Sequence, residues 1–142
     1  QKIKKGPLAE ILPNQVELWL DGGHNHDASL AISKTIYNWK RQDPSLTFHL
    51  IFGSLNNREI ESLLVPFVGI IDLIQTVAIP KHESTASPEN AANVALSLGF
   101  DAAPSNSLLS AIEAIISKSN GKRIILVYGS LYLAGSILGK NC

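Results

Sequence analysis

The sequence has 142 residues, with 12 basic and 12 acidic side chains, so its formal net charge is zero. Its length suits a single domain, and a hydrophobic content of 45% indicates a folded core rather than a disordered chain. The balanced charge argues against a nucleic-acid-binding surface, which requires clustered basic side chains. No apolar run approaches the ~20 residues of a membrane-spanning helix, so no membrane partner is expected.

The chain contains one cysteine, Cys142, and no methionine, not even at its first position. A single cysteine forms no internal disulfide and no thiolate metal cluster, which favours a reducing, cytoplasmic setting. The charged opening at 1–5 is not followed by the apolar segment of a signal peptide. We therefore expect the chain to be a piece of a longer protein.

The first half of the chain alternates between strand and helix patterns. β-Prone runs predict strands at 16–20, 47–52 and 73–79, the last stopped by a proline. Apolar residues recur at three- and four-residue spacings over 28–39, which predicts a helix with one buried face. A shorter helix is expected over 58–65, before another proline.

The second half continues this alternation. A proline in the first turn and a closing glycine predict a helix over 88–98. Ser107 is suited to cap a following helix over 108–116. The run 123–128 is nearly continuous in apolar residues, as expected for a strand covered on both faces. The last predicted element is a helix over 131–138.

The alternating pattern predicts an α/β fold, with a mainly parallel sheet, helices on both of its faces and right-handed crossovers. Ligands of such folds bind at the carboxyl ends of the strands. The candidate sites are therefore the turns at 21–27 and 129–132, with 53–58 and 81–87 behind them.

The turn after the first predicted strand combines a carboxylate, two glycines, two imidazoles and an amide. Asp21 can accept hydrogen bonds from ribose hydroxyls, and the start of a helix favours anionic groups. The same residues also suit a plain helix start, capped by Asn25 or Asp27, with both histidines in solvent. A zinc site formed by His24 and His26 is less favoured, because no third ligand is evident.

The turn after the last predicted strand offers a hydroxyl at the start of a helix. The Ser130 side chain and the first free N–H groups could hold a carboxylate or phosphate, although a plain N-cap serine explains the same residues. Ser130 is a poor candidate nucleophile, since the sequence lacks the second glycine of a nucleophile elbow. No Walker A motif occurs, so the main phosphate-binding loop of any nucleotide site lies elsewhere.

Taken together, DGGHN at 21–25 and GSLYLAG at 129–135 resemble the paired signatures of one enzyme family. This is the carboxy-terminal domain of the bifunctional dihydrofolate synthase/folylpolyglutamate synthase family, within the Mur ligase superfamily. The first motif opens the domain and the second closes it, so the resemblance covers essentially the whole chain.

The resemblance implies a Rossmann-like three-layer sandwich that forms the lid of an ATP-dependent ligase. Such an enzyme adds L-glutamate to dihydropteroate or folylpolyglutamate through an acyl phosphate, with ATP and Mg²⁺ held mainly by an upstream domain. Residues 1–14 would be a linker from that ATP-binding domain, and 15–142 the lid itself. The fragment alone is expected to catalyse nothing.

The resemblance also implies roles for single residues. Asp21 matches the aspartate that binds the ATP ribose, and His24 matches the histidine that faces the phosphates, with a catalytic role. Asn25 supports this nucleotide-binding turn, and Ser130 matches the serine that holds the carboxylate of the incoming amino acid. No residue of this chain is expected to bind a metal.

Several positions depart from the family pattern. Pro7 stands where the family has an arginine that reaches the nucleotide, so either Lys4 or Lys5 substitutes or that contact is missing. His26 replaces a proline, and the residues at 56–58 replace a Lys-Asp pair. A Mur ligase lid with a peptide substrate, or an interaction module without a ligand, are the alternative interpretations.

Overall fold

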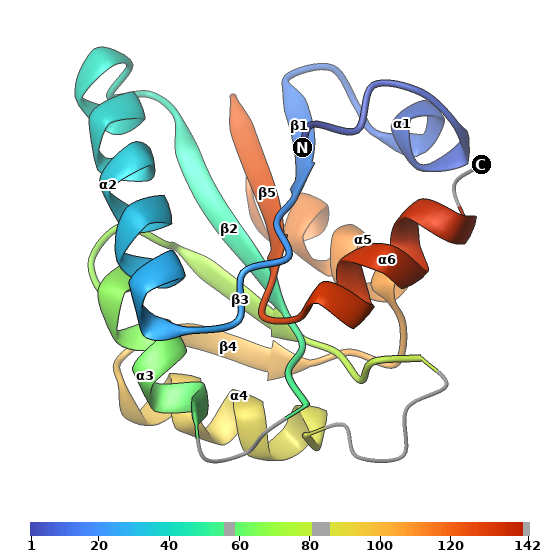
Figure 1. Cartoon of the computed structure of the whole chain (residues 1–142). Helices are drawn as coiled ribbons and strands as arrows, with labels where there is room; N and C mark the ends of the chain where they lie inside the picture. The colour runs from blue at the N-terminus through green and yellow to red at the C-terminus, as the bar shows by residue number, and fades with distance from the viewer. Residues whose placement is uncertain (56–58, 81–85, 141–142) are drawn as a thin grey trace.

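The computed structural model describes residues 1–55, 59–80 and 86–140. Strands and helices alternate along this part of the chain (Figure 1). In chain order the elements are α1 (Pro7–Ile11), β1 (Val16–Leu20), α2 (His26–Gln42), β2 (Thr47–Phe52), α3 (Ile60–Leu64), the 3₁₀ turn η2 (Val65–Phe67), β3 (Leu73–Thr76), α4 (Pro88–Ser97), β4 (Asp101–Pro104), α5 (Leu108–Lys118), β5 (Arg123–Tyr128) and α6 (Leu131–Lys140).

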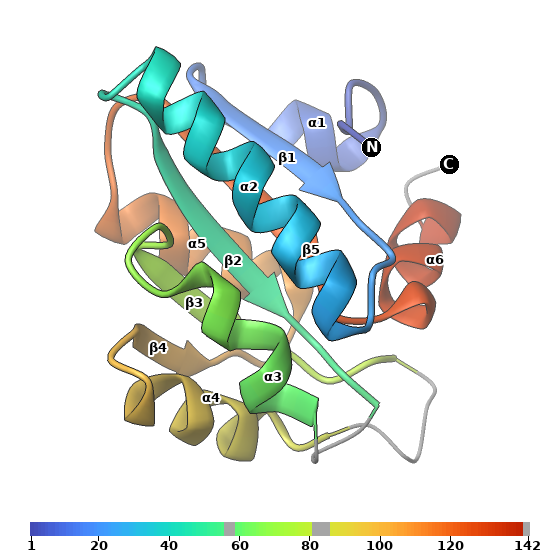
Figure 2. The ribbon, with the colours of Figure 1, turned by 60° about the vertical axis from the view of Figure 1, so that its left-hand side comes forward.

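The strands form one sheet in the order β1-β5-β2-β3-β4, and every neighbouring pair is parallel. Helices α2, α3 and α4 cover one face, whereas α1, α5 and α6 lie on the other (Figures 1 and 2). The sheet therefore separates two apolar cores, and the predicted α/β three-layer arrangement is confirmed. β5 is inserted between β1 and β2, and all six of its residues are buried, as its nearly continuous apolar run indicated.

Two elements were missed by the sequence patterns. The edge strand β4 has the sequence Asp-Ala-Ala-Pro, which is poor in β-branched and aromatic residues, and a proline is tolerated because the strand lies at an edge. Helix α1 falls inside the segment predicted to be a linker. The third strand ends at Thr76, earlier than predicted, although the Val77 amide still donates to Phe52 O.

The first residues of the chain pack along the free edge of β1. Lys2 pairs with Trp19 in an antiparallel bridge, and the Ile3 amide donates to Leu18 O at 2.8 Å. The Ile3 side chain is buried in the core beside α5 and α6. Residues 1–3 thus shield part of a sheet edge that would otherwise present unpaired backbone groups.

His49 is a buried imidazole on β2. Its side chain is 2% exposed; Nε2 lies 3.1 Å from Thr47 Oγ1, and Nδ1 has no hydrogen-bond partner among the described residues. Burial lowers the pKa of His49 to about 4, since a charged imidazole would lose its hydration there.

We expect His49 to make the domain less stable in acid. The imidazole binds a proton near pH 6.5 in the unfolded chain but only near pH 4 in the folded chain. Protonation of His49 therefore leaves the free energy of unfolding unchanged above pH 6.5 and lowers it by roughly 3 kcal/mol as the pH drops from 6.5 to 4. Urea unfolding at pH 7 and pH 4.5 should show a smaller pH dependence for His49→Leu than for the wild type. Equal pH dependence in the two proteins would contradict this account.

The carboxyl ends of β5 and β2 approach each other closely at Gly129. This residue has φ +117°, and a Cβ there would meet Gly53 O and lie 2.9 Å from the Phe52 ring. Both the backbone angle and the space therefore require glycine.

Gly129→Ala should lower the free energy of unfolding by about 2 kcal/mol or more, because strain and a backbone clash add. Gly135→Ala is the matched control. Gly135 lies within α6, has no atom within 4 Å of a built Cβ, and should gain up to ~1 kcal/mol in helix propensity. Chemical denaturation of both variants measures the difference, and equal stabilities would show that the close approach is not constraining.

Candidate functional site

The carboxyl ends of β1 and β5 lie side by side and bring the two sequence motifs to one edge of the sheet. Leu20 is in register with Val127, and the Asp21 amide continues the pairing with a 3.0 Å hydrogen bond to Val127 O. The turn into α2 follows Asp21, and Ser130 precedes α6 two residues after Tyr128. The two turns therefore lie at one edge of the sheet, which we call the rim.

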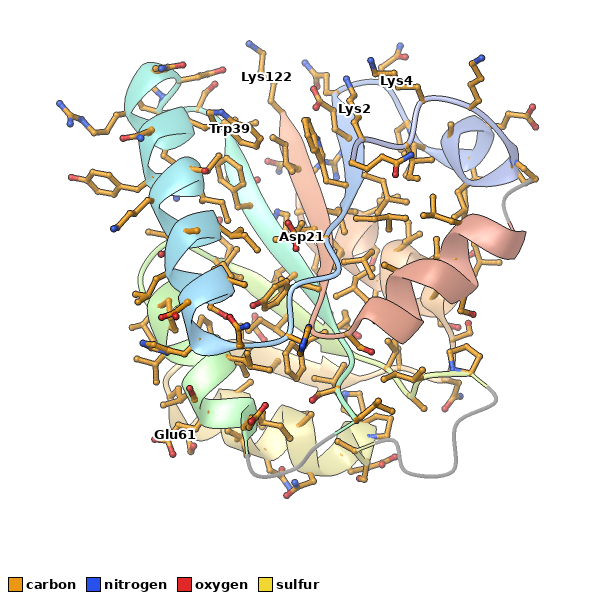
Figure 3. The ribbon with its side chains drawn as sticks, in the orientation of Figure 1. Lys2, Lys4, Asp21, Trp39, Glu61 and Lys122 are labelled. Carbon is orange, nitrogen blue, oxygen red and sulfur yellow. The ribbon has the colours of Figure 1, made fainter. Side chains whose placement is uncertain are left out.

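Asp21 shapes the turn that it opens. Its Oδ1 accepts a 2.7 Å hydrogen bond from the Gly23 amide, which is an Asx turn, and the side chain is half-buried. The residue borders an apolar cavity of about 230 Å³ between α2 and the sheet, together with Trp19 and Trp39. Figure 3 shows Asp21 near the middle of the view, where β1 ends. An acceptor beside apolar surface forms stronger hydrogen bonds than one in open water.

The two histidines of this turn have separate surroundings. His24 is exposed, and its Nδ1 lies 3.5 Å from Gly22 O. His26 Nδ1 lies 2.9 Å from Ser62 O, which ties the start of α2 to α3. They do not converge on one centre, so the disfavoured zinc interpretation gains no support.

Asn25 begins α2 as its N-cap. Its Oδ1 accepts a 2.8 Å hydrogen bond from the Ala28 amide, so of the two predicted capping residues it is Asn25, and not Asp27, that caps. The cap holds the last residue of the turn in place. Asn25 therefore supports the end of the turn, and its part in nucleotide binding stays a prediction.

The sequence patterns missed a buried pair of hydroxyls beneath this turn. Tyr128 and Ser29 are both fully buried, and Tyr128 OH lies 2.5 Å from Ser29 Oγ and 3.3 Å from Asn25 O. Burial raises the pKa of Tyr128, the hydrogen bond from Ser29 lowers it, and the negative charge of Asp21 raises it further. A tyrosine that follows four aliphatic residues at the end of β5 is the signal that could have indicated this pair.

Ser130 occupies the N-cap position of α6, where its carbonyl accepts a 3.2 Å hydrogen bond from the Ala134 amide. Its side chain is 3% exposed, so the serine lies below the surface of the rim. The start of α6 follows the carboxyl end of β5 and so lies at the same edge of the sheet as Asp21.

The donor groups do not fit a divalent cation. Within the described ranges, no group of three or more His, Cys, Asp or Glu side chains is close enough to hold a metal ion. Mg²⁺ prefers several oxygen ligands, and the described residues bring no such group together. No helix in the same ranges is both long and apolar enough to cross a bilayer.

Lys4, one of the two residues expected to substitute for the family arginine, lies away from Asp21 (Figure 3). The antiparallel pairing of residues 1–3 with β1 carries the chain away from Asp21, and Figure 3 shows Lys4 at the opposite end of the sheet. Pro7 lies further along, in the first turn of α1. The other departure, at 56–58, lies outside the described residues.

Comparison with known proteins identifies the family. Residues 4–140 match the family described as dihydrofolate synthetase, C-terminal domain, whereas no curated protein sequence matches the chain. Among solved structures, folylpolyglutamate synthase from Thermotoga maritima is similar, with a TM-score of 0.70 and 20% identity over 90% of this chain. The bifunctional folylpolyglutamate synthase/dihydrofolate synthase from Yersinia pestis, complexed with AMPPNP and a Mn ion, has a TM-score of 0.69 and 16% identity over 91% of this chain.

Escherichia coli FolC in complex with DHPP and ADP has a TM-score of 0.66 and 17% identity over 92% of this chain. The chain covers 28%, 29% and 30% of these three proteins, respectively, so it corresponds to less than a third of each. At these identities the structural likeness establishes the fold alone. The family match over nearly the whole sequence establishes more: this chain belongs to the family of dihydrofolate synthetase C-terminal domains.

Proposed function

We propose that this domain is the lid of an ATP-dependent ligase that joins L-glutamate to dihydropteroate, to folylpolyglutamate, or to both. The observation that carries the proposal is the shared rim, where Asp21, the exposed His24 and the start of α6 lie at the carboxyl ends of adjacent strands. The family match supports a pterin-bearing substrate over a cell-wall peptide or an interaction module without a ligand.

The proposed reaction has two steps. A carboxylate oxygen of the pterin substrate attacks the γ-phosphorus of ATP, which forms an acyl phosphate and releases ADP. The glutamate amine then attacks the acyl carbon, the amide bond forms, and inorganic phosphate leaves with the bonding electrons while the amine loses a proton. Water would hydrolyse the acyl phosphate, so a domain that closes over it has a physical purpose.

The rim supplies three contacts in this proposal. The Asp21 oxygen that does not bind Gly23 accepts hydrogen bonds from the ribose hydroxyls, and His24 reaches the phosphates across the interdomain cleft. The first turn of α6, opened by Ser130, holds the glutamate carboxylate through its N–H groups. ATP and Mg²⁺ are held mainly by the upstream domain, and the isolated domain is inactive.

In the full-length protein, Asp21→Asn and His24→Ala should each reduce kcat/KM for ATP about tenfold or more, because each removes a charged or hydrogen-bonding contact to the nucleotide. The asparagine keeps an oxygen acceptor for the Gly23 amide, so the turn is preserved. Asp27→Asn is the matched control, since Asp27 is exposed in the first turn of α2. Steady-state kinetics with unchanged rates in both site variants would contradict these assignments.

Ser130→Ala should raise KM for glutamate about fivefold or more and leave KM for ATP nearly unchanged, because the start of α6 would be less well held. Ser107→Ala is the matched control. Ser107 caps α5, where its side chain accepts from the Ser110 amide at 3.1 Å. Its loss should cost about 1 kcal/mol of stability without changing either KM. Equal glutamate KM values for the two variants would exclude this role of Ser130.

A further inference from the structure

The turn from Asp21 to Asn25 is attached to β5 at both of its ends. At its beginning, the Asp21 amide donates to Val127 O at 3.0 Å. At its end, Asn25 O lies 3.3 Å from the hydroxyl of Tyr128, the next residue of the strand. His24 therefore lies between two anchors that belong to consecutive residues of one strand.

The Tyr128 ring also forms the floor of the turn. A Cβ built on Gly23 would lie 2.9 Å from Tyr128 Cε1, 2.9 Å from Ala28 Cβ and 3.0 Å from Asp21 Oδ1. The backbone of the turn thus rests directly on the aromatic ring. The ring is fully buried, and it packs edge-on against Phe67 with 5.6 Å between centroids. It is accordingly a fixed support.

Ser29 completes the attachment. Its Oγ lies 2.5 Å from Tyr128 OH and 3.4 Å from Asn25 O, while its backbone amide donates to the same carbonyl at 3.1 Å. The two hydroxyls and the carbonyl therefore form one buried network. Because burial raises the pKa of Tyr128, its hydroxyl remains a protonated donor throughout the neutral pH range.

We propose that Tyr128 is a positioning residue whose hydroxyl, together with Ser29, holds the His24 turn in the arrangement needed at the nucleotide. Tyr128 is also followed directly by Gly129 and Ser130, so the end of β5 positions both the turn at 21–25 and the start of α6. The effect on catalysis rests on the proposed function, whereas the attachment of the turn does not.

The first test is a set of variants in the full-length protein. Tyr128→Phe and Ser29→Ala should each reduce kcat/KM for ATP about five- to tenfold, and the double variant should lose little more than either, since the hydroxyls act through one network. Thr76→Val is the matched control. It removes another buried hydroxyl, which donates to Pro88 O at 2.6 Å, and should lower the Tm without changing kcat/KM.

The second test asks whether Tyr128 acts through His24. In a His24→Ala background, Tyr128→Phe should have no further effect on kcat/KM for ATP, whereas a general loss of structure would reduce it again. A full effect in that background would overturn the proposal. The proposal would also be overturned if His24→Ala impaired the enzyme while Tyr128→Phe alone kept the wild-type kcat/KM for ATP.

Amide hydrogen exchange separates this proposal from the proposed function. The amides of residues 22–25 should exchange at least fivefold faster in Tyr128→Phe, while those of β5 keep their protection. If His24→Ala has no effect on activity, the nucleotide assignment fails, but faster exchange would still show that the hydroxyl holds the turn. Unchanged exchange in Tyr128→Phe would disprove the attachment whatever the kinetics.

Discussion

The parallel pairing of β1 with β5 is the constraint on which the rest of the site depends. These strands come from opposite ends of the chain, yet their register places Leu20 beside Val127 and carries Asp21 to the same edge as Ser130. Backbone hydrogen bonds and two apolar cores stabilise that register, because a slip by one residue would turn every buried side chain of β1 to the opposite face. The polar residues of the rim thus obtain their positions from the apolar residues beneath them.

The regular elements were largely predictable, for clear physical reasons. β5 is a nearly continuous apolar run, which indicates burial on both faces of the strand, and α2 has one apolar face, which indicates burial on one side. β4 was not predictable, because its four residues are held by the neighbouring strand rather than by their own propensity. Helix α1 likewise follows a charged opening that resembles a linker.

The site was predictable only in part. The turn at Asp21 and the helix start at Ser130 carry recognisable residue patterns, and the order of elements places them at strand ends. The network of Tyr128, Ser29 and the Asn25 carbonyl has no local pattern, since two of its members are separated by most of the chain. The partners of a buried hydroxyl are set by tertiary packing, which periodicity does not report. The burial of Ser130 was hidden for the same reason.

The close approach of Gly129 to Gly53 has a consequence for movement. β1, β5 and β2 are joined at their carboxyl ends by hydrogen bonds from Asp21 N to Val127 O and from Gly53 N to Tyr128 O, and no side chain separates the two glycines. The three strand ends therefore form a stiff unit. Any movement of the domain would therefore carry this whole edge as a rigid body.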